Sequence, residues 1–149
     1  MRAYADTSWW LALRNSSDTL HRRATAVFDV EPQPEIIWTP WQRVEVFNSI
    51  RQAERNGLLQ AGAANAHIHQ IEREVRLGYW THVEFTWTEA IRTANELSAA
   101  HSRKLLIRGM DLFHVAAALE TASDWFLTFD IEQVALAKAA GLKVFPRDV

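Results

Sequence analysis

Hydrophobic residues along this chain form short continuous runs, separated by longer stretches in which they recur with a helical period. The runs at residues 2–5, 35–38 and 125–129 are short and strand-like, as expected for a buried sheet. Residues 82–87 alternate polar with β-branched or aromatic side chains, and residues 142–145 form a last apolar run. The pattern therefore predicts a sheet of four to five strands.

Helical periodicity fills the intervals between these strands, and several boundaries carry recognisable caps. Thr39 precedes Pro40, and Gln42 follows three positions after Thr39, which together predict a capped helix start. Gly78 and Gly141 follow helical stretches and predict their ends. The predicted helices cover residues 8–14, 20–28, 40–55, 61–77, 88–102, 111–121 and 131–140.

Strands alternating with helices predict an α/β fold with three layers, α/β/α, around a central, mostly parallel sheet. The chain has 149 residues and no repeat, low-complexity tract or linker, so we expect a single domain, residues 1–149.

There is no cysteine, which excludes disulfides, thiolate metal sites and cysteine nucleophiles. No apolar run resembles a signal peptide or approaches a membrane span, so the expected location is cytoplasmic.

Two acids directly follow predicted strands, where ligands gather in open parallel sheets. Asp6 follows the first strand and Asp130 follows the aromatic strand at 125–129. Each residue can also be explained as a helix N-cap, with Gln133 completing a capping box after Asp130. Taken singly, neither acid establishes a functional site.

Two further acids lie on predicted helices. Asp111 begins a helix that is apolar nearly all round and should therefore be buried, where a carboxylate needs a partner or a metal. It could simply be an acid in a first helical turn, paired with Arg108. Glu45 shares a polar helix face with Asn48, which suits either solvent or the wall of a polar groove.

Together, these four acids and their neighbours resemble the PIN-domain nucleases. The resemblance covers most of the chain outside residues 57–108, and the opening at residues 6–8 is most similar to VapC-type toxins of bacterial toxin–antitoxin pairs. The motifs that carry it are Ala-Asp6-Thr-Ser8, Val-Glu45-Val-Phe-Asn48, Met-Asp111-Leu-Phe-His114-Val-Ala-Ala-Ala and Leu-Thr128-Phe-Asp130.

The resemblance implies a PIN-like fold and a metal-dependent endoribonuclease. The metal-binding acids would be Asp6, Glu45, Asp111 and Asp130, with Ser8 and Thr128 as supporting hydroxyls. Mg²⁺ or Mn²⁺ would be the metal, since hard ions prefer carboxylate oxygens and activate water for attack on phosphorus. The implied partners are an RNA substrate, an antitoxin protein and a second copy of the chain.

One departure from the family pattern concerns the region after the fourth acid. Some PIN domains have a further Asp or Asn about one turn later, where this chain offers only Glu132 or Gln133. A second metal would then be weakly held or recruited with the substrate.

The net charge of −2 also argues against RNA binding through bulk positive charge.

Other polar and aromatic residues have simpler explanations. His114 could orient Asp111, but a hydrogen-bonded packing role is the preferred interpretation. Trp9, Trp10 and Trp41 could stack on unpaired bases, although aromatic residues more often belong to a core or an interface. The basic group of Arg103, Lys104 and Arg108 suits a solvated loop nearly as well as a phosphate site.

Three alternatives to a toxin remain open at the level of sequence. A metal-dependent phosphatase is one, but such enzymes usually have a second acid two residues after the first, where this chain has Ser8. A PIN-domain nuclease of RNA processing is another. The third is a PIN-like module that binds RNA or protein without cutting, against which the presence of all four acids speaks.

Overall fold

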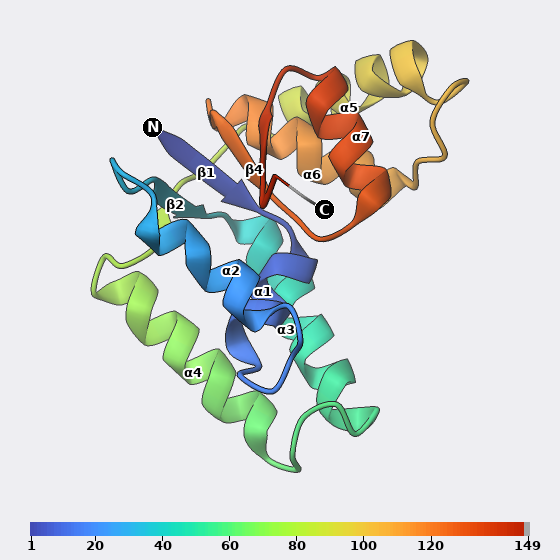
Figure 1. Ribbon diagram of the computed structural model, residues 1–149. Coiled ribbons are helices and arrows are strands. Elements are labelled where there is room, and N and C mark those ends of the chain that lie inside the picture. Colours follow the sequence, from blue (N-terminus) through green and yellow to red (C-terminus); the bar gives the residue numbers. More distant parts are fainter. Residues whose placement is uncertain (148–149) are drawn as a thin grey trace.

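The computed structural model, which describes residues 1–147, contains a sheet of five strands with helices on both faces (Figure 1). All four strand pairings are parallel, so the predicted α/β class is confirmed and the sheet is parallel throughout. The last two residues of the predicted domain lie outside this range. In spatial order the strands are β3 (Thr81–His82), β2 (Glu35–Trp38), β1 (Arg2–Ala5), β4 (Trp125–Leu127) and β5 (Lys143–Phe145).

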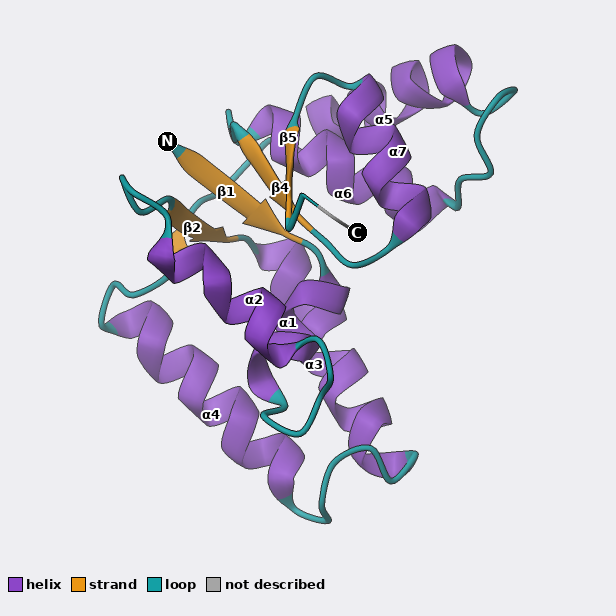
Figure 2. Ribbon diagram, in the orientation of Figure 1, coloured by secondary structure: helices purple, strands orange, loops and turns teal. Residues whose placement is uncertain are grey.

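The helices form two layers, one on each face of the sheet (Figure 2). One layer contains α1 (Thr7–Arg14), α2 (His21–Thr25), α3 (Pro40–Arg55) and α4 (Ala63–Arg76). The other contains α5 (Trp87–His101), α6 (Gly109–Glu120) and α7 (Ile131–Ala139).

The central strand distributes its side chains between two hydrophobic cores. Ala3 and Ala5 face the layer of α1 to α4, whereas Tyr4 faces α6 and α7. All three residues are fully buried. This alternation follows from the two-residue period of a strand, and burial on both faces explains why residues 3–5 carry no charged side chain before Asp6.

Most tryptophans belong to the first core. Trp10 packs edge-on against Trp9, Trp38 and Trp80, with ring centroids 5.2, 5.0 and 5.2 Å away. Trp9 and Trp10 have no exposed surface, so the core interpretation is confirmed for both and base stacking on them is excluded. Trp41 lies in a separate aromatic group with Trp87 and Phe113.

The capping box at the start of α3 also ties this helix to the central strand. Thr39 Oγ1 accepts a hydrogen bond from Gln42 N, and Gln42 Oε1 accepts one from Thr39 N, at 3.3 and 2.7 Å. Gln42 Nε2 donates to the carbonyl of Ala5 at 2.6 Å. The predicted cap is therefore confirmed, and it fixes the beginning of α3 beside the residue that precedes Asp6.

The predicted strand at residues 82–87 is wrong for most of its length. Strand β3 ends at His82, although Val83 N still donates to the Trp38 carbonyl at 2.9 Å. Beyond it the aromatic side chains pack on a helix instead of continuing the ladder: Phe85 and Trp87 contact Phe113 of α6. Tertiary packing thus overrides a β-like alternation at the edge of the sheet.

Two other predicted elements are shorter or less regular than expected. Strand β4 ends at Leu127 rather than at residue 129, because the next residues turn into the site described below. The predicted helix over 20–28 is α-helical only over His21–Thr25 and continues as a 3₁₀ turn, Ala26–Asp29. Within the described part of the chain, none of the helices has the length and apolar character required to cross a membrane.

Candidate active site

The ends of the two central strands place Asp6 and Asp130 at one edge of the sheet. Strand β1 pairs with β4 in register Ala5 to Leu127, so the residues that follow these strands emerge side by side. Asp6 N donates to the Leu127 carbonyl at 3.0 Å, which extends the ladder by one residue. A parallel sheet collects its ligand-binding residues at this carboxyl edge.

Asp6 is buried and accepts four hydrogen bonds. Its Oδ1 accepts from Ser8 Oγ at 2.7 Å and from Trp9 N at 3.0 Å, the second being the N-cap of α1. Its Oδ2 accepts from Thr128 Oγ1 at 2.8 Å and from Gln133 Nε2 at 3.0 Å. Burial raises the pKa of this carboxyl and outweighs its hydrogen bonds, which act in the opposite direction. Asp6 is therefore both a helix cap and a fixed, desolvated acid.

The two hydroxyls predicted to support the site both contact Asp6 and also hold the loop after β4. Ser8 Oγ accepts from Phe129 N, and Thr128 Oγ1 accepts from Asp130 N, each at 2.9 Å. These bonds couple the position of Asp130 to that of Asp6. Gln133 donates the fourth hydrogen bond to Asp6, a contact that the sequence pattern did not predict.

Glu45 of α3 is held by Thr7 and by His114, which is itself bonded to the buried Tyr4. Its Oε2 accepts from Thr7 Oγ1 at 2.6 Å and is hydrogen-bonded to His114 Nε2. His114 Nδ1 is in turn 3.0 Å from the Tyr4 hydroxyl. Burial by itself would raise the Glu45 pKa, but the hydrogen bond and charge of His114, with help from Thr7, leave that pKa lowered.

His114 is therefore a hydrogen-bonded packing residue, as preferred from the sequence, but its partner differs from the one considered there. Its two ring nitrogens are hydrogen-bonded to Glu45 of α3 and to Tyr4 of β1. His114 is only 2% exposed and Tyr4 is completely buried. No sequence pattern indicated this connection, because Tyr4 lies in an ordinary buried strand.

Asp111 lies in the first turn of α6, where its Oδ2 accepts from Arg108 N at 3.1 Å. It is buried, with 6% of its surface exposed. Burial is the main cause that raises its pKa, and the neighbouring charge of Asp130 raises it further. Pairing with Arg108 was the simple explanation offered by the sequence, and the structure shows that pairing together with burial.

Asp130 is the N-cap of α7. Its Oδ1 accepts from Glu132 N at 2.8 Å and from Gln133 N at 3.2 Å, so the predicted N-cap is confirmed. The predicted capping box is wrong, because the Gln133 side chain donates to Asp6 and Asp130 N donates to Thr128 Oγ1. The other oxygen, Oδ2, faces the guanidinium of Arg108 at 3.6 Å. One carboxylate oxygen thus caps the helix while the other faces Arg108.

The four predicted acids line one pocket, although they come from separate elements. The pocket is lined by Asp6, Thr7, Ser8, Leu11, Glu45, Arg108, Met110, Asp111, His114, Asp130 and Gln133. Carboxylate oxygens are the donors that Mg²⁺ and Mn²⁺ prefer, so the residue types fit such an ion. Within residues 1–147, no three side chains of His, Asp or Glu are grouped closely enough to hold an ion.

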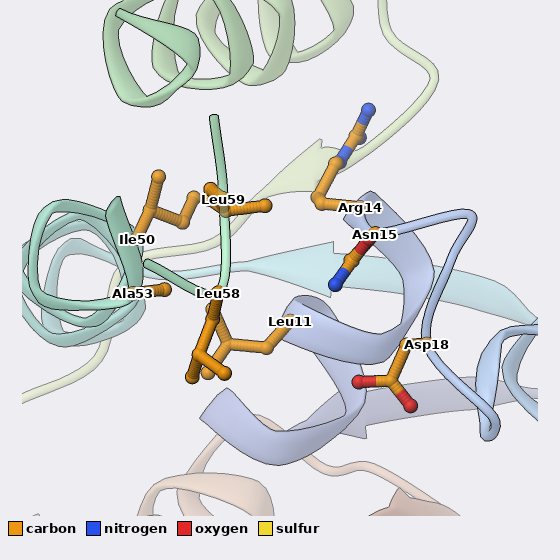
Figure 3. Close-up of a pocket in the computed structure, with 8 residues that line it drawn as sticks. All are labelled: Leu11, Arg14, Asn15, Asp18, Ile50, Ala53, Leu58 and Leu59. Atoms are coloured by element: carbon orange, nitrogen blue, oxygen red, sulfur yellow. The ribbon is translucent and has the colours of Figure 1, made fainter. Parts of the chain in front are cut away.

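A second, mainly apolar pocket lies next to this one. Its walls come from α1 and the loop after it on one side, and from the end of α3 and the loop after it on the other (Figure 3). Leu11 lines both pockets, so the two are adjacent. The lining residues are Leu11, Arg14, Asn15, Asp18, Ile50, Ala53, Leu58 and Leu59.

Three solved structures share this fold over almost the whole chain. VapC20 of Mycobacterium tuberculosis, a Sarcin-Ricin loop cleaving toxin, has a TM-score of 0.66 and 21% identity, covering 97% of this chain and 99% of that one. VapBC2 from Rickettsia felis, bound to a DNA fragment from its promoter, gives 0.64 and 12%, covering 97% of each chain. FitAcB from Neisseria gonorrhoeae gives 0.63 and 14%, covering 96% of each. The chain has the PIN-like fold.

The relationship is one of structure rather than of sequence. No protein-family model matches the chain, and no curated protein is significantly similar to it. The structural neighbours are PIN-domain components of toxin–antitoxin pairs, as the sequence motifs indicated. In this PIN-like domain the four motif acids line the pocket at the carboxyl edge of the sheet.

Proposed function

We propose that this PIN-like domain is a Mg²⁺- or Mn²⁺-dependent endoribonuclease and the toxin of a toxin–antitoxin pair. The observation that carries the proposal is the common pocket of Asp6, Glu45, Asp111 and Asp130. These acids come from two strand ends and two helices far apart in sequence, and each has its own set of hydrogen bonds. Helix capping alone would not require four acids to line one pocket.

In this proposal the four acids hold the ion and the surrounding residues fix the acids. Bound there, the ion would lower the pKa of a water molecule and offset charge that develops on the phosphate. Ser8 and Thr128 hold Asp6, and His114 holds Glu45, which keeps the carboxylates oriented. The position two residues after Asp6 carries Ser8, bonded to Asp6, which does not support the phosphatase alternative.

The direct test is RNA cleavage by the purified chain with Mn²⁺ or Mg²⁺ and with EDTA. Asp6→Asn and Asp111→Asn should each remove metal-dependent cleavage while circular dichroism remains native. Asp29→Asn provides a matched control, because Asp29 is exposed and does not line the pocket. Cleavage that persists in EDTA, or full activity in both site variants, would refute the proposal and leave the RNA- or protein-binding module.

The antitoxin partner is proposed to bind in the apolar pocket of Figure 3. Two of the structural neighbours, VapBC2 and FitAcB, are antitoxin-bound complexes. The pocket offers leucine side chains for an apolar partner segment (Figure 3), and one of them, Leu11, also lines the acidic pocket. A segment bound there would extend towards the acids, where one of its basic side chains could form a charge-assisted pair.

Co-expression with a candidate antitoxin, such as any small protein found to be encoded immediately upstream, tests this partner. Leu58→Asp should abolish co-purification, because it places a charge in the pocket lining. Leu106→Asp is the matched control, since Leu58 and Leu106 are 70% and 80% exposed and Leu106 does not line that pocket. Equal loss in both variants would exclude this pocket as the binding site.

A further inference from the structure

The guanidinium of Arg108 extends across three acids at the mouth of the acidic pocket. Its Nε is 3.4 Å from Asp111 Oδ2, and its Nη2 is 3.6 Å from Asp130 Oδ2 and 3.5 Å from Glu132 Oε2. Two of these acids are among the four proposed to hold the metal. Arg108 therefore supplies positive charge at the carboxylates that a divalent ion would need.

These contacts are ion pairs that can be broken at small cost. All three distances exceed the usual 2.7–3.2 Å range of an N–H···O hydrogen bond. The Arg108 side chain is 71% exposed, and exposed ion pairs contribute only about 0–1 kcal/mol. A divalent ion bound by several carboxylates can therefore displace the guanidinium.

The side chain is not required to begin the helix that follows it. The main-chain N–H of Arg108 donates to Asp111 Oδ2, and any residue other than proline would supply this bond. What is particular to arginine here is a long, forked cation that reaches Asp130 and Glu132 on and beside the next helix.

We propose that Arg108 is a built-in counter-ion that competes with the divalent metal for Asp111 and Asp130, and that, once displaced, it binds a phosphate of the RNA beside the site. This inference rests on the proposed nuclease function. In the metal-free protein the guanidinium neutralises part of the acidic cluster. When metal binds, the guanidinium loses these acceptors at the mouth of the pocket, where a substrate phosphate offers it paired oxygens.

Two measurements on the same variant separate this role from a merely structural one. Mn²⁺ binding is measured by calorimetry without RNA, and KM is measured for cleavage of a short single-stranded RNA. Arg108→Gln should tighten Mn²⁺ binding about two- to fivefold, since it removes a weak competing ion pair. The same variant should raise KM about tenfold, since it removes a charge-assisted contact with phosphate.

Two further variants control for charge and side-chain shape. Arg103→Gln removes an exposed cation from the preceding loop, outside the pocket lining, and should leave both quantities near wild type. Arg108→Lys keeps the charge but not the fork, so it should retain most of the competition with Mn²⁺ and lose part of the RNA contact. Thermal melts in EDTA check that each variant is folded.

The outcomes distinguish this inference from the proposed function. Wild-type cleavage combined with unchanged or weaker Mn²⁺ binding in Arg108→Gln would overturn the counter-ion role and leave the nuclease proposal intact. Equal effects of Arg103→Gln and Arg108→Gln on Mn²⁺ binding and KM would mean that any nearby positive charge produces them. That result would also overturn the counter-ion role of Arg108. A wild-type protein that neither binds Mn²⁺ nor cleaves RNA would refute both.

Discussion

Several acids around the acidic pocket have two roles. Each contributes to local structure, such as a helix cap, and each also contacts other residues of the pocket. Asp6 and Asp130 cap helices through one oxygen and face other partners through the second. Asp111 accepts a main-chain hydrogen bond and also lies in an apolar environment that raises its pKa. The capping and the site interpretations of these acids are therefore compatible.

The buried contact between Tyr4 and His114 gives a prediction for a single hydroxyl. Tyr4→Phe removes the group that lies 3.0 Å from His114 Nδ1 and should destabilise the fold by about 0.5–1.5 kcal/mol. It should also lower kcat, because His114 would hold Glu45 less firmly. Denaturant melts and RNA cleavage measure the two effects. Tyr79→Phe, at a 69% exposed tyrosine, is the control, and identical behaviour of the two variants would contradict the prediction.

The raised pKa values of Asp6 and Asp111 predict how the metal-free protein responds to pH. A group with a raised folded pKa stabilises the fold fully below its unfolded pKa, and this contribution is lost as pH rises through the folded pKa. In EDTA, the melting temperature should therefore increase as pH falls from neutral into the weakly acid range. Glu45 affects the pH dependence of stability in the opposite direction. Because its folded pKa is lowered, its contribution to stability is lost as pH falls through that folded pKa.

Asp111→Asn isolates one of the two groups. It should reduce the gain in melting temperature on mild acidification, because it removes one carboxyl whose pKa is raised on folding. The exposed Asp29→Asn should keep the wild-type response. A wild-type melting temperature that only decreases from neutral to weakly acid pH would show that these two acids do not govern the pH dependence.

At the scale of elements, α7 allows the cap and the metal role of Asp130 to be separated. Asp130→Asn retains an oxygen that can accept from Glu132 N, so its melting temperature in EDTA should stay close to wild type. Asp130→Ala loses the cap and should cost about 1 kcal/mol. Both variants should reduce the stabilisation by Mn²⁺, since metal binding to the native state raises stability by mass action. An intact Mn²⁺ shift in Asp130→Asn would make this residue a cap only.

At the scale of the whole molecule, a partly exposed aromatic surface lies beside the site on α3, α5 and α6. Trp41 contacts Trp87 and Phe113, with ring centroids 6.5 and 5.2 Å apart. Around this group, Val44, Trp87 and Ile91 are 64, 44 and 59% exposed. Aromatic groups of this kind are enriched in protein interfaces, and we propose that this surface forms a homodimer.

Light scattering at tens of micromolar tests the homodimer. Ile91→Glu should produce a monomer, because it places a charge in the proposed apolar contact. The control is Leu77→Glu on the opposite helical layer, where Leu77 is 61% exposed against 59% for Ile91. A wild-type monomer, or an unchanged dimer in Ile91→Glu, would contradict the proposed surface.

The sequence alone determined the features that depend on neighbouring residues. Strand runs, helix periods and caps predicted the α/β class, the capped start of α3 and the emergence of Asp6 and Asp130 after strands. The predicted extent of β3 was wrong, because the packing of Phe85 and Trp87 on Phe113 depends on contacts between distant parts of the chain. Period and capping are short-range properties, and so they can be read along the chain.

Only the tertiary structure decided which side chains meet. The strand order β3-β2-β1-β4-β5 places β1 beside β4, which brings Gln133 to Asp6 across more than a hundred residues. The same arrangement of layers sets His114 against Glu45 and Arg108 against Asp130. These partnerships depend on the order of strands and on helix packing, to which distant parts of the chain contribute together, so no local pattern in the sequence contains them.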